Sequence, residues 1–294
     1  MSRPILPKFL LPLLLLVSSA MAQKPLVTYK NCTFEKTAWA DGDSFLVKPP
    51  VGEAISIRLY GADCIEWHVT DTTDSRRLRA QRSYFGISRV DPDPNQAAEI
   101  AKGFGKEAAA FVEAALQKPF TVHTAGADAR GDENYTRVYA FIVTADGKDL
   151  AEELVKVGLA RAFGVTRATY DVPPRSGDEY DAALDDLELQ AATNKRGVWA
   201  KTNWNQLPEE RKIQREEEAK DEIGIDNAKD LKGKKVNPNT AARGELMNLP
   251  GVGEATANAI IGKRPYAKAE DLLNVPGIGP KSLEKLKPHL EFGK

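Results

Sequence analysis

The chain has 294 residues, 42% of them hydrophobic, which is enough for about two domains of roughly 100 to 200 residues each. Its formal net charge is −1, so any nucleic-acid binding must come from locally placed Arg and Lys rather than from overall charge. The two cysteines, Cys32 and Cys64, are too few for a disulfide framework or a thiolate zinc site. The sequence leaves open whether they form a single disulfide bond with each other.

The first segment has the pattern of a cleaved signal peptide. Arg3 and Lys8 precede an apolar run over residues 9–17, and Ala20-Met21-Ala22 supplies the small-residue cleavage pattern. The alternative is a membrane anchor, but the run falls short of the ~20 residues that span a bilayer. We therefore expect residues 1–22 to be removed, leaving no stable membrane span and a protein that is periplasmic or secreted.

Strands and helices alternate over residues 26–203 in the order of an OB-type barrel. Strand patterns fill residues 32–60, where Ile55, Ile57 and Leu59 alternate with polar residues and turn Arg58 away from the core. A polar stretch, 69–95, has the composition of a long surface loop. Beyond it we expect a helix at 97–116, strands at 120–124 and 137–143, and helices at 150–157 and 178–195. This order predicts an α+β domain: a five-stranded barrel with packed helices.

The last third of the chain has a different composition. Residues 204–237 are rich in charged side chains and have the character of a linker, partly helical at best. An internal repeat follows, in which residues 246–253 (LMNLPGVG) recur as residues 272–279 (LLNVPGIG). Residues 238–294 are therefore predicted to form a second, small all-α domain.

Carboxylates and arginines gather in three short segments of the first domain. Asp43, Asp63 and Glu66 could share one hard cation, and Ca²⁺ accepts such oxygen ligands, main-chain carbonyls included. Arg58 and Arg137 would face the same place. A metal, a carboxylate base and paired guanidinium groups are what hydrolysis of a phosphodiester requires.

These segments resemble the thermonuclease (staphylococcal nuclease-like) family in order and spacing. The resemblance lies in Asp41-Gly42-Asp43, in residues 58–66 (RLYGADCIE), and in Tyr135-Thr136-Arg137, and it covers roughly residues 26 to 203. It implies the following roles: calcium ligands Asp43 and Asp63, with the backbone carbonyl of Cys64; general base Glu66; phosphate clamps Arg58 and Arg137; and substrate contact Tyr135.

The repeated segment resembles the tandem helix-hairpin-helix motifs of the DNA-receptor proteins of competence. Gly251 and Gly253 in the first copy, and Gly277 and Gly279 in the second, would form tight turns before helices whose free N–H groups bind phosphate oxygens. Lys281 would add positive charge. Such contacts imply sequence-independent binding of the duplex DNA backbone. The alternative is a packing or protein-interaction module.

Together these features predict an exported, calcium-dependent endonuclease that a helix-hairpin-helix module tethers to DNA. By resemblance it would cleave DNA and RNA and leave 3′-phosphate ends. One alternative is a non-catalytic extracellular DNA-binding or uptake protein, which would have no reason to retain Glu66, Arg58 and Arg137 together. A protein-interaction scaffold is a third. The preferred polymer and the oligomeric state stay open at this point.

Overall fold

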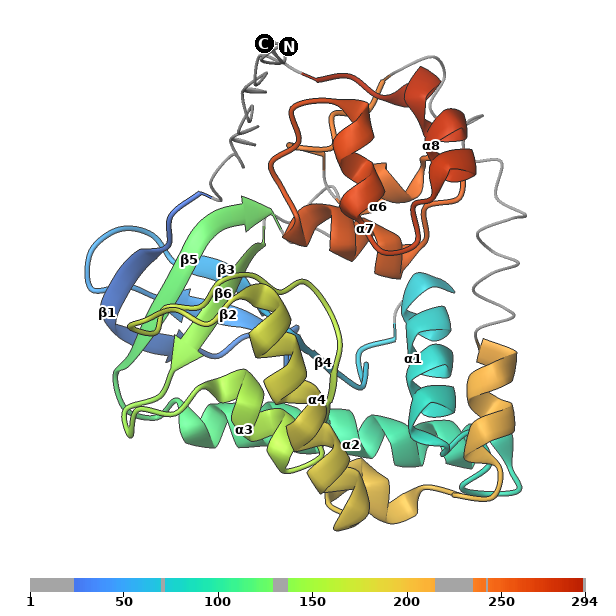
Figure 1. The fold of residues 1–294 in the computed structure, drawn as a ribbon. Coiled ribbons are helices and arrows are strands. Elements are labelled where there is room, and N and C mark those ends of the chain that lie inside the picture. The colour runs from blue at the N-terminus through green and yellow to red at the C-terminus, as the bar shows by residue number, and fades with distance from the viewer. Residues whose placement is uncertain (1–23, 70–71, 129–136, 215–234, 242, 293–294) are drawn as a thin grey trace, which may run out of the picture.

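The computed structural model describes residues 24–69, 72–128, 137–214, 235–241 and 243–292, arranged as Figure 1 shows. The predicted signal peptide, Tyr135 and most of the predicted linker lie outside these residues. The strands are β1 (Val27–Glu35), β2 (Ser44–Lys48), β3 (Ile55–Leu59), β4 (Ala62–Cys64), β5 (Phe120–Asp128), β6 (Val138–Val143) and β7 (Ala160–Ala162). The helices around them are α1 (Thr72–Phe85), α2 (Pro94–Ala115), α3 (Leu150–Lys156), α4 (Gly177–Thr193) and the 3-10 helix η1 (Gly197–Lys201).

Five strands close into a barrel in the order β1-β2-β3-β6-β5, which confirms the predicted OB-type fold. Neighbouring strands are antiparallel except β3 and β6, which pair in parallel. Alternation along β2 and β3 turns Phe45, Val47, Ile57 and Leu59 into the core, where all four are buried. Because β3 runs on into β4, which pairs with β7, the residues after Leu59 leave the barrel and reach the surrounding helices.

The helices α2, α3 and α4 lie together against one end of the barrel (Figure 1). Asp149 caps α3: its carboxylate accepts the N–H groups of Ala151 and Glu152. Gly158, after α3, lies against Gly197 of η1 so closely that a Cβ on Gly158 would be 2.3 Å from the Arg196 carbonyl oxygen. These contacts fix the helices beneath β4 and β7, the pair of strands that carries several site residues.

The polar stretch at residues 69–95 is not a surface loop, and this prediction was wrong. It contains α1, and α2 begins within it at Pro94. Leu78 and Phe85 of α1 are buried with Ile65 and Trp199 in a small core of their own. The sequence did not predict this helix because it lacks the wide apolar face of a typical amphipathic helix. Tertiary packing of a few apolar residues stabilises it instead. In Figure 1, α1 lies beside the loop that follows β4.

The predicted linker is packed where it begins. Residues 207–214 are helical, and the guanidinium group of Arg211 lies 4.3 Å from the centre of the Tyr84 ring on α1. Arg211 also donates from Nε to the Tyr84 carbonyl at 2.9 Å. The barrel domain therefore extends its contacts past residue 203, and these contacts support α1 from the outside.

The C-terminal unit is helical, as predicted. It contains α6 (Arg243–Met247), α7 (Glu254–Gly262), η3 (Ala269–Asn274), α8 (Pro280–Leu286) and η4 (Lys287–His289). A bridge between Val236 and Leu290 joins the beginning of the unit to its end. The unit packs on the barrel domain through Gly262, where a Cβ would lie 3.0 Å from the Thr166 carbonyl oxygen. Within the described residues, no helix combines the length and the apolar character that crossing a bilayer requires.

Candidate active site and helical hairpins

The turn before β2 positions Asp43. Asp41 Oδ1 accepts the N–H groups of Asp43 and Ser44, at 3.1 and 2.7 Å, which closes the turn. A glycine is required between the two aspartates, because a Cβ on Gly42 would lie 2.6 Å from Cys64 Sγ. The buried Asp43 carboxylate accepts the Ser44 hydroxyl and the N–H of Cys64, at 2.8 and 2.9 Å. The turn is thereby joined to β4.

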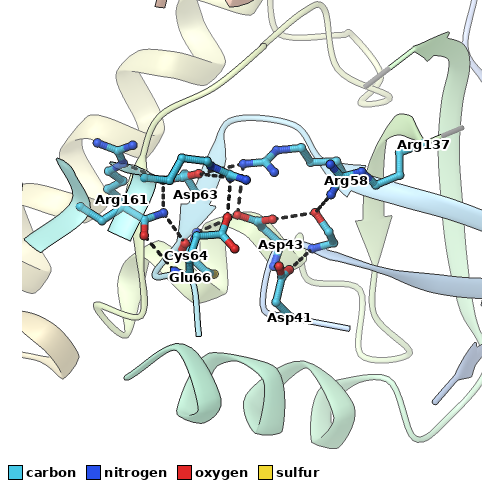
Figure 2. Close-up of polar contacts among 11 residues, drawn as sticks. Asp41, Asp43, Arg58, Asp63, Cys64, Glu66, Arg137 and Arg161 are labelled. Atoms are coloured by element: carbon cyan, nitrogen blue, oxygen red, sulfur yellow. Dashed lines mark hydrogen bonds and ion pairs between the residues drawn. The ribbon is translucent and has the colours of Figure 1, made fainter. Parts of the chain in front are cut away.

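Asp63, on β4, is the centre of an ion-pair network (Figure 2). Oδ1 accepts Arg58 Nη2 at 2.8 Å, and Oδ2 accepts Arg161 Nε at 2.8 Å. Oδ2 also accepts the amide Nε2 of Gln81 at 2.9 Å, and Nη2 of Arg77 lies 3.5 Å from Oδ1. Burial alone would raise the pKa of Asp63, but the three arginines overcome burial and hold it well below the usual range.

Arg58 contacts the Asp43 carboxylate directly, and Arg137 is linked to it through the Ser44 hydroxyl group. Nη2 of Arg58 is 3.4 Å from Asp43 Oδ2. Nη1 of Arg137 donates to Ser44 Oγ at 3.1 Å, and this hydroxyl donates to Asp43. Nη1 of Arg58 is buried and has no hydrogen-bond partner among the described residues. A buried guanidinium N–H without a partner is costly, so this group points to an anionic ligand.

Glu66 follows β4 and is bound from α1. Its carboxylate Oε1 lies 2.6 Å from Nη2 of Arg77, and its N–H donates to Gln81 Oε1 at 2.8 Å. Burial raises the pKa of Glu66 above the usual range, and the Asp43 charge adds to the effect, although Arg77 opposes it. A carboxylate whose pKa is raised is a stronger base than an ordinary Glu, which suits a group that accepts a proton.

The predicted calcium ligands are all present, and their oxygens are of the kind that Ca²⁺ accepts. Burial and the charges of Asp43 and Glu66 raise the pKa of Asp41 well above its usual value, and a cation bound beside these carboxylates would oppose that shift. Asp63 is saturated by the donors described above, and the Cys64 carbonyl accepts Gln81 Nε2 at 2.7 Å. No group of three or more His, Cys, Asp or Glu side chains in the described part of the chain is arranged to hold a metal ion.

Both cysteines are buried and free, and burial raises the thiol pKa of each. The side chain of Cys64 adjoins Gly42, so this residue takes part in closing the turn on β4. A nucleophilic role is not supported, because a buried thiol with a raised pKa holds little thiolate.

The two helical hairpins repeat each other in detail. Gly251 and Gly277 have φ angles of +76° and +88°, which glycine adopts without strain. Gly253 and Gly279 are the N-cap residues of α7 and α8, with nearly the same extended backbone angles. Lys281 is exposed in the first turn of α8. The predicted residues thus occupy equivalent positions in the two hairpins.

Four residues that contact the candidate site were missing from the sequence-based set: Asp41, Arg77, Gln81 and Arg161. Arg77 and Gln81 lie in the stretch assigned to a loop, and their spacing of four within an Arg-rich run was the available signal. Arg161, on β7, had no sequence signal, because its contact with Asp63 spans 98 positions. Tyr135 lies outside the described residues.

Comparison with known families gives two matches along the chain. Residues 56–201 match the model of the staphylococcal nuclease homologues, and residues 231–291 match that of the helix-hairpin-helix motif. The chain thus carries a staphylococcal-nuclease-like domain followed by a helix-hairpin-helix module. This combination defines its class: a nuclease-type domain joined to a DNA-binding motif.

Similar proteins match only a short part of the chain. ComE operon protein 1 of Bacillus subtilis (strain 168) is 47% identical over 60 residues, which are 19% of this chain and 29% of that protein. Endonuclease/exonuclease/phosphatase family domain-containing protein 1 of Homo sapiens is 46% identical over 57 residues, 18% of this chain and 10% of its own length. Photosystem II extrinsic protein U of Gloeothece citriformis (strain PCC 7424) is 36% identical over 59 residues, which are 20% of this chain and 48% of that protein. The chain therefore spans less than half of each of these relatives.

Proposed function

We propose that this protein is an exported, calcium-dependent nuclease that hydrolyses phosphodiester bonds of DNA and RNA and leaves 3′-phosphate ends. The observation that carries the proposal is the convergence of Glu66, Arg58 and Asp43 in one buried cluster, with Nη1 of Arg58 left without a partner among the described residues. A site that only gripped DNA would have no use for a buried carboxylate beside its arginines, and this favours hydrolysis over binding alone.

In this mechanism Glu66 accepts a proton from the attacking water, and the resulting hydroxide adds to the phosphorus atom. The bond between phosphorus and the 5′-oxygen breaks, so the phosphate stays on the 3′ end and the leaving 5′-oxygen takes up a proton from solvent. Arg58 and Arg137 donate to the phosphate oxygens, where negative charge grows in the transition state. Asp43, Asp63 and the Cys64 carbonyl are the proposed holders of Ca²⁺, and the last two also accept hydrogen bonds from Gln81 Nε2. When bound, the ion supplies positive charge that orients water and phosphate.

The helix-hairpin-helix module is proposed to hold the enzyme on its polymer. Gly251, Gly253, Gly277 and Gly279 would present backbone N–H groups to the duplex phosphates, and Lys281 would add charge. Cleavage of residues 1–22 would place the mature chain, beginning near Gln23, in the periplasm or outside the cell. N-terminal sequencing of protein from the native host tests this, and a retained Met1 would contradict it.

The decisive test is digestion of plasmid DNA and of RNA by the full chain, with Ca²⁺ or with a chelator. We expect Ca²⁺-dependent cleavage of both, and we expect Glu66→Gln to lower turnover by about 10² to 10⁴ while the fold persists, because the amide keeps the shape but accepts no proton. Circular dichroism is the control for folding. Wild-type turnover in a folded Glu66→Gln variant would contradict the role of Glu66 and favour the binding-only alternative.

A further inference from the structure

The helix α1 presents two side chains to the candidate site from one face. Arg77 and Gln81 are four positions apart, so they project from the same side of the helix. Both contact Asp63, and both contact Glu66, one through its carboxylate and the other through its backbone N–H. The helix is therefore part of the site rather than a covering layer.

Gln81 fixes this arrangement, and both ends of its side-chain amide are hydrogen-bonded within the site. Its side chain is completely buried; Oε1 accepts the Glu66 N–H, and Nε2 donates to Asp63 Oδ2 and to the Cys64 carbonyl, at 2.8, 2.9 and 2.7 Å. Both hydrogens of the amide group are used. Gln81 is therefore a positioning residue, which holds the segment from Asp63 to Glu66 against α1 and has nothing left to offer a ligand.

Arg77 differs from the other two arginines of the cluster. Arg58 and Arg161 each form a 2.8 Å bond to Asp63, whereas Arg77 lies 3.5 Å from that carboxylate and forms its short contact, 2.6 Å, with Glu66. Its side chain is 14% exposed, against 6% and 7% for Arg58 and Arg161. Arg77 is thus the most exposed of the three arginines that contact Asp63, and its main partner is the candidate base.

The ion pair at 2.6 Å holds the Glu66 carboxylate against the Arg77 guanidinium group, so neither group is available to a substrate while the pair lasts. A substrate phosphate is a competing anion, and arginine binds phosphate through the same planar, charge-assisted hydrogen bonds. Exchange of Arg77 from Glu66 to phosphate would free the base and neutralise the substrate in one movement. Given the nuclease function above, we propose that Arg77 is a further phosphate-binding residue of this site, held by Glu66 until substrate arrives.

The test measures binding without cleavage. The full chain, in chelator, is titrated with a short single-stranded DNA whose phosphorothioate linkages resist hydrolysis, and the dissociation constant is followed over a range of salt concentrations. We expect Arg77→Ala to weaken binding by about tenfold or more, as loss of a charge-assisted hydrogen bond does. The salt slope should fall by about 0.7, the value for one phosphate contact to a single strand.

Arg76→Ala is the matched control, because Arg76 is the exposed neighbour on the same helix. It should change neither the affinity nor the slope by a comparable amount. If Arg77→Ala does not fold, Arg77→Lys and Arg77→Met give the same comparison, since Lys keeps the charge and Met keeps only the stem. Equal affinities and equal slopes for folded Arg77 and Arg76 variants would overturn the proposal.

A double-mutant cycle tests the exchange itself. Glu66→Gln should tighten binding severalfold, because it releases Arg77, and the gain should vanish when Arg77→Ala is also present. An equal gain with and without Arg77 would show that Glu66 acts only as a repelling charge and would contradict the exchange. Wild-type protein that binds with the Arg77-dependent slope but cleaves nothing would instead contradict the nuclease function and leave the role of Arg77 standing.

Discussion

Gly42 shows how one residue sets the geometry of the site. Its position between two aspartates allows the turn to lie directly on β4 and α2: an added Cβ would be 2.6 Å from both Cys64 Sγ and Ala108 Cβ. Neither neighbour has a flexible end that could move away, because both are buried. Any side chain here must push Asp43 away from the Cys64 N–H that it accepts.

We therefore expect Gly42→Ala to lower the free energy of unfolding by about 1 to 3 kcal/mol, the usual cost of overpacking a core, and to reduce nuclease turnover as well. Gly103→Ala is the control, because Gly103 lies in α2 and a Cβ added there would have no atom within 4 Å. That change should leave turnover unaltered. Urea unfolding and turnover of both variants provide the measurement, and a Gly42→Ala variant as stable and active as wild type would contradict this packing.

At the scale of elements, α3 depends on one buried carboxylate. Asp149 accepts two N–H groups at the start of α3 and the hydroxyl groups of Tyr180 and Tyr170, at 3.0 and 3.2 Å. Asp149→Ala removes the cap, worth about 1 kcal/mol, and leaves the buried Tyr180 hydroxyl group unpaired, at about 1 to 3 kcal/mol. We expect a loss of roughly 2 to 4 kcal/mol in urea unfolding, and a loss below about 1 kcal/mol would contradict this role.

The same carboxylate gives stability a pH dependence. Burial raises the pKa of Asp149 from 3.8 to about 6, so between these values the folded protein binds a proton that the unfolded chain releases. The stability contributed by the protonated form is complete below about pH 4 and is lost as the pH rises through 6. Asp149→Asn should flatten this part of the stability profile, and an unchanged slope in the variant would contradict the shift.

Elements with a strong local signal could be predicted, and elements that depend on distant partners could not. The alternation of β3 and the Ala-rich α2 are encoded in short windows of sequence, and the repeated LxNxPGxG segment indicated the hairpins. The helix α1 has few apolar residues, and its stability comes from Ile65 and Trp199, which lie elsewhere in the chain. The site shows the same difference. Asp43, Asp63 and Glu66 could be predicted from their spacing in short segments, whereas the contacts of Arg77, Gln81 and Arg161 could be found only from the folded structure.

For the whole molecule, the two-part construction predicts that binding and cleavage can be separated. Deleting residues 238–294 should leave cleavage of short oligonucleotides largely intact, because the candidate site lies on the turn before β2, on β3, on β4 and the residues after it, on α1 and on β7. Affinity for long duplex DNA should fall, and the salt slope should decrease by about 0.9 for each phosphate that the module no longer neutralises. Binding isotherms at several salt concentrations test this, with circular dichroism of the barrel as the control; equal slopes would argue that the module does not touch DNA.

The bridge between Val236 and Leu290 has a consequence for how such proteins are assembled. Val236 donates to the His289 carbonyl and accepts the N–H of Glu291, so the chain enters and leaves the helical unit at the same point. A unit closed in this way can be joined to another protein through one short junction without disturbing its interior. That property agrees with relatives in which a similar segment of 57 to 60 residues makes up 10% of one protein and 29% of another. The helical unit can therefore be joined to different proteins, and in this chain it follows a staphylococcal-nuclease-like barrel.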